Sequence, residues 1–224
     1  MQDQIVLEAK NVSKTVASPE GQLTILADVS LSVRSGETLA IVGASGAGKS
    51  TLLALLAGLD SPSTGRVLIA GVDLTDLDED GRAALRGKHV GFVFQSFHLI
   101  PSLTAVENVM LPLELTGRRD ARSAAAAALE QVGLTPRQAH YPKQLSGGEQ
   151  QRVAIARAFV THPAVLFADE PTGNLDTATG QRVTDLLFAL NRSTGSTLLL
   201  VTHDHALAAR CGRVLELDAG HAIN

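Results

Sequence analysis

The feature that most constrains the fold of this chain is a glycine-rich loop between a short apolar run and an amphipathic stretch. The run Leu39–Val42 has the length and β-branched character of a buried strand, and Lys49–Leu59 has an apolar face at helical spacing. The residues leading from strand into helix are Gly43, Ala44, Ser45, Gly46, Ala47, Gly48, Lys49, Ser50 and Thr51. The pattern G-x-x-x-x-G-K-S between a strand and a helix predicts a phosphate-binding loop.

Each residue type in this loop has a physical task. Gly43, Gly46 and Gly48 let the backbone turn tightly, so that its N–H groups face inward. The helix start adds the positive end of its dipole. Lys49 is expected to reach the β- and γ-phosphates of a nucleotide, and the Ser50 hydroxyl to ligate Mg²⁺. A chance glycine loop is the alternative, which the strand before it and the helix after it disfavour.

Composition excludes several protein classes. Of 224 residues, 45% are hydrophobic and 19% charged, which excludes intrinsic disorder. Nineteen Lys and Arg against 23 Asp and Glu give a net charge of −4, so we expect no nucleic-acid partner. Cys211 is the single cysteine, and the longest apolar runs, Leu52–Ala57 and Leu198–Val201, are too short to span a bilayer. We therefore expect a soluble, cytosolic-type chain that works at a membrane only through a partner.

Short β-branched and apolar runs alternate with helical stretches along the chain. The predicted strands are Ile5–Leu7, Leu39–Val42, Val67–Ala70, Val90–Phe94, Val165–Ala168, Thr197–Val201 and Val214–Leu217. The predicted helices are Lys49–Leu59, Arg118–Gln131, Gln150–Val160 and Gln181–Asn191. This alternation predicts an α/β fold with a mainly parallel sheet. The acidic stretch Asp73–Asp80 is expected to be a solvated loop and helix start.

The alternation breaks between about residues 96 and 160, where helix patterns occur without a clear strand. We interpret this part as a helical subdomain inserted into one catalytic domain. The α/β core is then formed by residues 1–95 and 161–224, and the inserted subdomain by residues 96–160.

Two carboxylates end a predicted strand. The run Val165–Ala168 is followed by Asp169 and Glu170. In doubly wound sheets, ligands gather at the carboxyl ends of the strands, so these side chains are expected beside the phosphate loop. Asp169 then suits the Mg²⁺ shell, and Glu170 suits a general base acting on water. The alternative is a pair of solvated carboxylates at a strand end.

A second helix start resembles an anion site. Ser146 is a good N-cap for the predicted helix, and Gly147 and Gly148 leave backbone N–H groups bare. Glu149 follows directly. From these residues alone, an ordinary capped helix start is equally expected.

The stretch Leu145–Gln150 resembles the signature sequence of the ABC (ATP-binding cassette) ATPases. The resemblance covers essentially the whole chain and includes the family's motifs in order, namely Gly43–Thr51, Gln95, Leu145–Gln150, Asp169–Glu170, Asp176 and His203. The stretches Val93–Ser96, Gln144–Arg157 and Ala168–Asp176 look most like the branch that serves lipoprotein release, macrolide export and cell division. Within that branch, Arg86–Phe97 and Leu166–Glu170 look closest to the YbbA-like proteins.

The resemblance implies a P-loop NTPase fold with a RecA-like, mainly parallel sheet. It adds an N-terminal antiparallel β subdomain and the inserted helical subdomain that carries the signature. It also implies a head-to-tail dimer of two copies that encloses two ATP molecules. Each ATP would touch the phosphate loop of one copy and Ser146, Gly147, Gly148 and Glu149 of the other.

The same resemblance assigns the remaining residues of the site. Glu170 would polarise the attacking water, and Gln95 would contact the Mg²⁺ or that water. His203 would contact the γ-phosphate, and Asp176 would lie at the dimer seam. Mg²⁺ would be held by Ser50, Gln95 and Asp169, and Lys49 would act on the phosphates.

One position departs from the family pattern. Many cassettes stack an aromatic side chain on adenine, and the matching place here lies near Thr15–Val16. Val16 offers only an apolar contact, so we expect weak adenine selectivity.

The resemblance also implies a membrane partner. We expect an integral permease-like subunit with a large extracytoplasmic domain, which would hold this chain at the cytoplasmic face of the inner membrane. Phe97, Leu99, Ile100 and Leu103 are expected to contribute an apolar docking patch, and Phe92 and Phe94 to be core strand residues. The complex would export or extract a lipid-anchored or hydrophobic substrate, or transmit force. The alternatives are a non-transporting complex that regulates cell-envelope enzymes, and a soluble ABC ATPase.

Overall fold

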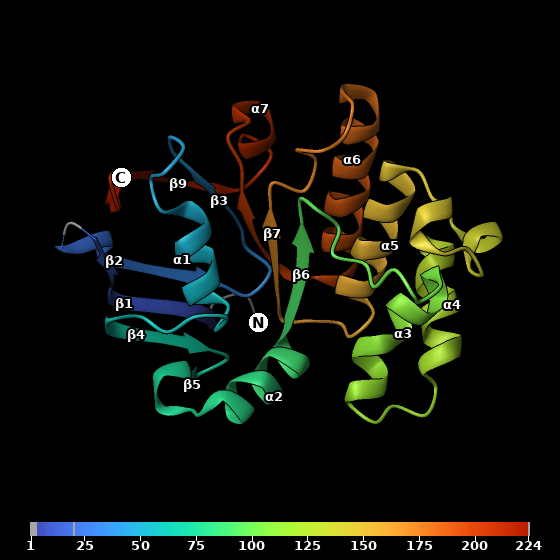
Figure 1. Cartoon of the computed structure of the whole chain (residues 1–224), viewed down its shortest axis with the longest axis horizontal. Helices are drawn as coiled ribbons and strands as arrows, with labels where there is room; N and C mark the ends of the chain where they lie inside the picture. Colours follow the sequence, from blue (N-terminus) through green and yellow to red (C-terminus); the bar gives the residue numbers. More distant parts are fainter. Residues whose placement is uncertain (1–3, 20, 224) are drawn as a thin grey trace. The chain divides into compact units, whose positions relative to one another are not determined.

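The computed structural model describes residues 4–19 and 21–223, which fall into two compact units (Figure 1). The first unit comprises residues 1–86 and 197–224, and the second comprises residues 87–196. The helical subdomain predicted over residues 96–160 lies within the second unit. Its boundaries with a catalytic core remain a prediction.

A long hairpin organises an antiparallel sheet in the first unit. The strand order is β2-β1-β4-β5, with β1 (Ile5–Ser18), β2 (Gly21–Arg34), β4 (Thr64–Ile69) and β5 (Val72–Asp73). Asn11 and Asp28 have φ angles of 51° and 53°, and Asn11 Nδ2 donates to Asp28 Oδ1 at 2.7 Å. Asn and Asp tolerate this left-handed conformation, so the register of β1 shifts here and the hairpin bends.

Four further strands of the first unit follow the order β10-β9-β3-β8. They are β3 (Thr38–Val42), β8 (Thr197–Val201), β9 (Arg213–Asp218) and β10 (His221–Ile223). β3 pairs in parallel with both β8 and β9. Leu39–Ile41 and Leu198–Leu200 are fully buried, as a parallel strand that is covered on both faces requires. β3, β8 and β9 confirm the strands predicted at Leu39–Val42, Thr197–Val201 and Val214–Leu217.

Helices follow several strands of the first unit along the chain. They are α1 (Lys49–Leu56), α2 (Glu79–His89), the short α7 (His205–Ala208) and a 3₁₀ turn at Leu74–Asp76. α1 contacts β1, β2, β4 and β8, and buries Leu52 and Leu56. It ends at Leu56, three residues before the predicted end, because Gly58 turns left-handed with a φ of 68°.

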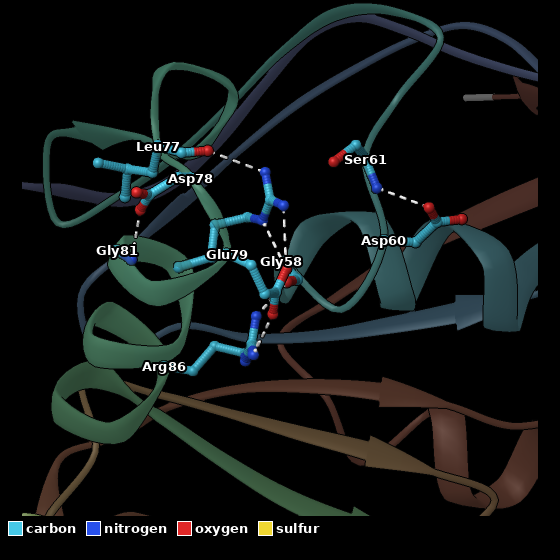
Figure 2. A network of polar contacts seen from close by, with 9 residues as sticks. Gly58, Asp60, Ser61, Leu77, Asp78, Glu79, Gly81 and Arg86 are labelled. Atoms are coloured by element: carbon cyan, nitrogen blue, oxygen red, sulfur yellow. Dashed lines mark hydrogen bonds and ion pairs between the residues drawn. The ribbon is translucent and has the colours of Figure 1, made fainter.

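A charged network ties the start of α2 to the turn after α1 (Figure 2). Arg86 donates to the Gly58 carbonyl at 2.6 Å and to Glu79 at 2.8 Å. Arg82 donates to the same carboxylate at 2.9 Å and to the Leu77 carbonyl at 2.9 Å. The two arginines hold the pKa of the Glu79 carboxyl below its ordinary value, Arg86 having the larger effect. The helix start predicted within Asp73–Asp80 is therefore present at Glu79, and these hydrogen bonds hold it to the turn after α1.

The second unit holds a parallel strand pair and a group of helices (Figure 1). β6 (Val90–Phe94) pairs with β7 (Val165–Asp169), and the helices are α3 (Ala105–Leu115), α4 (Ala121–Gln131), α5 (Gly147–Phe159) and α6 (Thr177–Thr194). Short 3₁₀ turns lie at Thr135–Arg137 and Pro142–Gln144. α3, α4 and α5 contact one another, and α5 also contacts β6 and α6. Residues 96–160 contain helices and no strand, as predicted.

The segment between β6 and α3 is held by a buried asparagine. Asn108 accepts from the Ile100 N–H at 2.8 Å and donates to the Ile100 and Leu103 carbonyls at 3.2 and 3.0 Å. Thr104 and Glu107 form a capping box at the start of α3. Within residues 4–19 and 21–223, no helix is both long and apolar enough to cross a membrane.

Candidate functional site

Three glycines shape the phosphate loop of the first unit. Gly43, Gly46 and Gly48 have φ angles of 149°, 82° and 96°, which favour glycine over other residues. A Cβ atom at Gly43 would lie 2.1 Å from the Leu217 carbonyl oxygen, and one at Gly48 would lie 2.8 Å from the Leu26 side chain. At Gly46, apart from Gly46 itself and its two chain neighbours, no heavy atom of the described residues lies within 4 Å of that position. The loop is thus packed on one side and open at Gly46, where a phosphate can reach its amides.

The start of α1 adds positive charge to this loop. Its N-cap, Gly48, makes no side-chain hydrogen bond, and the first turn contains no acidic residue. The positive end of the helix dipole therefore faces the loop without a neutralising carboxylate from that turn. The Lys49 ammonium lies on the loop, donating to the Gly43 and Ala44 carbonyls at 2.8 Å each. Ser50, the predicted Mg²⁺ ligand, is exposed in the same turn.

His203 leaves the first unit's sheet at the same end as the phosphate loop. β3 and β8 are parallel neighbours in which Ile41 pairs with Val201. Gly43 and His203 each follow two residues later. Asp204 N–H donates to the Thr202 hydroxyl at 3.0 Å, and the Asp204 carboxylate caps α7. His203 is exposed between these anchors.

The second unit brings Gln95, Asp169 and Glu170 to one end of its strand pair. Phe94 pairs with Asp169 in the parallel register of β6 and β7. Gln95 and Glu170 are the next residue on each strand. Glu170 is half-buried and has a φ of 45°, a left-handed conformation that is uncommon outside glycine and asparagine. Gly173 N–H donates to the Glu170 carbonyl at 3.0 Å and closes this turn.

Two residues that the sequence did not single out hold this end of the strands. Asn174 exchanges two hydrogen bonds with Gln95, through the Gln95 side chain at 3.2 Å and its carbonyl at 3.1 Å. Gln151 is fully buried and donates to the Phe94 and Pro171 carbonyls at 3.2 and 2.5 Å. Gln151 lies in α5, directly after the signature stretch Leu145–Gln150, and the sequence around it does not indicate these distant partners.

The signature helix α5 begins with a capping box. The Ser146 hydroxyl accepts from the Glu149 N–H at 3.3 Å, and the Glu149 carboxylate accepts from the Ser146 N–H at 2.8 Å. That backbone bond, with further contacts including Arg137, lowers the pKa of the Glu149 carboxyl. A Cβ atom at Gly148 would lie 2.4 Å from the Thr179 methyl group, whereas one at Gly147 would make ordinary contacts. Gly148 is therefore required for packing the start of α5 against the start of α6.

Asp176 lies directly before α6 in the second unit. Asp176 is exposed and caps α6 by accepting from the Thr179 N–H at 3.0 Å. Hydrogen bonds from Thr179, the side-chain bond having the largest effect, lower the pKa of the Asp176 carboxyl.

Val16 is half-buried in β1, opposite Leu23 of β2. The first unit contains no Phe, Tyr or Trp.

The predicted apolar patch is only partly exposed. Ile100 is exposed, whereas Phe97, Leu99 and Leu103 are half-buried. Phe92 and Phe94, predicted as core residues, are also only half-buried, and their rings stack with centroids 5.1 Å apart.

The predicted Mg²⁺ ligands are a hydroxyl, an amide and a carboxylate. Among residues 4–19 and 21–223, no group of three or more His, Cys, Asp or Glu side chains is placed to hold a metal ion. Mg²⁺ prefers oxygen donors and is commonly bound through one or two protein groups together with substrate phosphates. Gln95 uses its amide nitrogen for Asn174, so its oxygen is the donor atom that suits the ion. Ser50, Gln95 and Asp169 each offer an oxygen donor of the kind that Mg²⁺ prefers, and their joint binding of one ion stays a prediction.

Comparisons with known proteins show the family and the fold of this chain. The profile of the ABC transporter family matches residues 26–173. The chain is 59% identical over 217 residues to the ABC transporter ATP-binding protein YbbA of Escherichia coli strain K12, covering 96% of this chain and 95% of that protein. It is 49% identical over 218 residues to the lipoprotein-releasing system ATP-binding protein LolD of Legionella pneumophila, covering 96% of each.

Two solved structures of the ABC transporter cassette MJ0796, described as bacterial, are also similar. One is a dimeric post-hydrolysis state bound to ADP and phosphate, with a TM-score of 0.89 and 41% identity. The other is a dimeric form with a TM-score of 0.90 and 42% identity. Each match covers 97% of both chains. The predicted cassette fold, with an antiparallel β subdomain and helices, is thereby confirmed.

Proposed function

This chain belongs to the ABC transporter family of ATP-binding proteins, and we propose that it hydrolyses ATP as the energy-supplying subunit of a membrane complex. Closure of two copies around ATP and their reopening after hydrolysis would move the membrane subunit. The reaction is the transfer of the γ-phosphoryl group to water, giving ADP and phosphate.

The phosphate loop is the observation that carries this proposal. Its glycines expose the backbone at Gly46, the start of α1 lacks an acidic residue, and the Lys49 ammonium lies on the loop. Backbone amides, a helix dipole and an ammonium together favour a polyphosphate.

The residues at the ends of the strands in the two units would each take a different part in ATP hydrolysis. Lys49 would hold the β- and γ-phosphates, and His203 would contact the γ-phosphate. Glu170 would accept a proton from the attacking water, while Gln95, fixed by Asn174, would orient that water. Mg²⁺, held by Ser50, Gln95 and Asp169, would neutralise charge on the phosphates.

A second copy of the chain would complete each site. Ser146, Gly147, Gly148 and Glu149 of that copy would face the γ-phosphate, and Asp176 would lie at the seam. The Ser146 capping box fixes this helix start, and Gly148 holds it against α6. The dimeric MJ0796 cassettes support the proposal that two copies act together.

The partner would be an integral membrane subunit with a large extracytoplasmic domain, which would hold this chain at the cytoplasmic face of the membrane. LolD is named as part of a lipoprotein-releasing system. Its likeness to this chain favours extraction of a lipid-anchored or hydrophobic substrate. The similarity to YbbA does not indicate a substrate.

Hydrolysis is tested with the purified chain, Mg²⁺ and ATP. Phosphate release is expected, and Lys49→Ala should lower ATP affinity at least about a hundredfold because the phosphates lose their cation. Lys143→Ala removes an exposed lysine outside the loop and should leave affinity unchanged. Equal affinity for the Lys49→Ala and wild-type chains would contradict the proposal.

The membrane role is tested with Glu170→Gln, which should slow hydrolysis and prolong the ATP-closed state. Native membranes are solubilised with ATP, the tagged chain is recovered, and co-purifying proteins are identified by mass spectrometry. An integral membrane protein with a large extracytoplasmic domain is expected. Recovery of soluble proteins alone, under conditions in which another cassette retains its permease, would favour a soluble ABC ATPase.

A further inference from the structure

A buried glutamine of the second unit joins the carboxyl ends of β6 and β7. Gln151 lies in α5 and is fully buried. Its side-chain nitrogen Nε2 donates to the Phe94 carbonyl at 3.2 Å and to the Pro171 carbonyl at 2.5 Å. The amide group carries two hydrogens, one for each carbonyl. One side chain therefore connects the last residue of β6 to the second residue beyond β7.

The two carbonyls lie next to the residues that are proposed to act on the attacking water. Phe94 directly precedes Gln95, and Pro171 directly follows Glu170. The parallel pairing of β6 with β7 has Phe94 opposite Asp169 as its last pair. Gln151 thus holds the two segments together at the point where the pairing of the strands stops.

The turn after β7 packs directly on the Gln95 side chain. A Cβ atom at Gly173 would lie 2.6 Å from Gln95 Nε2 and 3.0 Å from its Cδ. Asn174 in the same turn exchanges two hydrogen bonds with Gln95. Glu170 begins this turn with a φ of 45°, a conformation that persists only where its surroundings hold it. The geometry of Gln95 and Glu170 therefore depends on the spacing of the two strand ends, which Gln151 spans.

The oxygen of the same side chain has no partner. Gln151 Oε1 is buried and accepts no hydrogen bond from any residue that the structure describes. An unpaired buried acceptor opposes folding, so it offsets part of the stability that the two donated bonds contribute. We expect the main effect of this amide to be on the position of the strand ends.

We propose that Gln151 is a positioning residue for ATP hydrolysis, whose two donated bonds set the spacing of Gln95 and Glu170 around the attacking water. Its full burial keeps it from contacting the nucleotide, so it acts through these two residues. This inference rests on the proposed function, and adds to it a residue that sets the geometry of the hydrolytic pair.

The first test compares steady-state hydrolysis of MgATP by the wild-type chain and by Gln151→Met, which keeps the length of the side chain and removes the amide. We expect kcat to fall at least about tenfold, because misplaced reacting groups lose up to about a hundredfold in rate. KM should change less than about threefold, since the phosphate loop is unaltered. Gln151→Leu, which also lacks a donor, is the second variant, and melting temperatures verify that each is folded.

A matched control removes the same kind of bond at the other end of the strands. Asn191 is buried and donates to the Ser196 carbonyl at 2.5 Å. The Ser196 hydroxyl donates to the Pro163 carbonyl, just before β7, at 2.9 Å. Asn191→Leu should lower the melting temperature but keep kcat within about threefold of wild type at a temperature where it is folded. An equal loss of kcat in Asn191→Leu and Gln151→Met would overturn the positioning role.

A double variant distinguishes positioning from general damage. In the Glu170→Gln chain the hydrolytic pair is already incomplete, so adding Gln151→Met should slow single-turnover hydrolysis by less than about threefold. A purely structural role would slow hydrolysis by the same factor in both backgrounds. Full additivity of the two substitutions would therefore overturn the inference.

The outcomes separate this inference from the proposed function. Hydrolysis by the wild-type chain, together with an unchanged kcat in Gln151→Met, would overturn the inference alone. Absence of hydrolysis by a folded wild-type chain that binds ATP would contradict the proposed function, and this inference with it.

Discussion

Thr202 donates its backbone N–H to the Ile41 carbonyl at 3.2 Å, which aligns the ends of β8 and β3. Ile41 is followed by Val42 and the phosphate loop, and Thr202 is followed by His203. Parallel pairing of Ile41 with Val201 sets this alignment. Two segments more than 150 residues apart in sequence therefore leave the first unit's sheet at one end.

His203→Ala should separate hydrolysis from binding. The phosphate loop keeps its glycines and Lys49, so affinity for ATP should change less than threefold. Hydrolysis should fall about a hundredfold, the order expected for losing one group that acts on the reacting phosphate. Phosphate release and equilibrium binding of a fluorescent ATP analogue measure the two effects. Unchanged hydrolysis would remove His203 from the site.

Gly148→Ala should destabilise the chain. The added Cβ would lie 2.4 Å from the Thr179 methyl group. Overpacking of this kind costs about 1–3 kcal/mol, measured by urea unfolding. Thr179→Ser removes that methyl group and should restore stability in the double variant. Gly147→Ala is the matched control, because its Cβ would make only ordinary contacts. Equal effects at Gly147 and Gly148 would contradict this packing argument.

Purine selectivity should be weak. The first unit contains no Phe, Tyr or Trp, and Val16 offers only an apolar contact. An aromatic stacking partner contributes about 0.5–1.5 kcal/mol, or about 2- to 13-fold in affinity. At matched saturation, GTP hydrolysis should remain within about tenfold of ATP hydrolysis. Val16→Tyr should increase ATP affinity within the same range. GTP hydrolysis far below that of ATP would contradict the prediction.

Cys211 should react slowly with alkylating reagents. It packs against Ala40, Val42 and Ala208, and burial raises the pKa of its thiol to about 11. The raised pKa favours the neutral thiol until the pH approaches 11, so at pH 8 only about 0.1% is the reactive thiolate. Iodoacetamide labelling should be about a hundredfold slower than in the unfolded chain. Equal rates would show that the thiol is not protected.

The sequence predicts the buried strands well because they are short, continuous apolar runs, as at Leu39–Val42 and Val165–Ala168. It predicts only Ile5–Leu7 of the long β1 strand, since the remainder mixes polar and apolar residues that are half exposed. α5 begins at Gly147, three residues earlier than predicted, because the Ser146–Glu149 capping box determines its start.

In the candidate site too, residues that are contiguous in sequence can be predicted, and residues that act through distant partners cannot. The phosphate loop is contiguous in sequence, so its glycines and Lys49 can be identified there. Asn174 and Gln151 act through bonds to Gln95 and Phe94 that lie more than 50 residues away in sequence.

The proposed function requires that each ATP is bound and hydrolysed by two copies of the chain. Lys49→Ala disables the phosphate loop, and Ser146→Arg disables the signature helix start. Each variant alone should be nearly inactive. In a head-to-tail dimer of one copy of each, one of the two sites combines an intact loop with an intact signature.

Phosphate release by an equimolar mixture of the two folded variants therefore tests whether the site is shared. Random pairing puts half of the dimers in the mixed form with one intact site each, so activity should recover to about a quarter of the wild-type value, provided that the two sites act independently. Melting temperatures of the separate variants verify that both are folded. Activity equal to the sum of the two variants, despite demonstrated mixed dimers, would contradict the shared site.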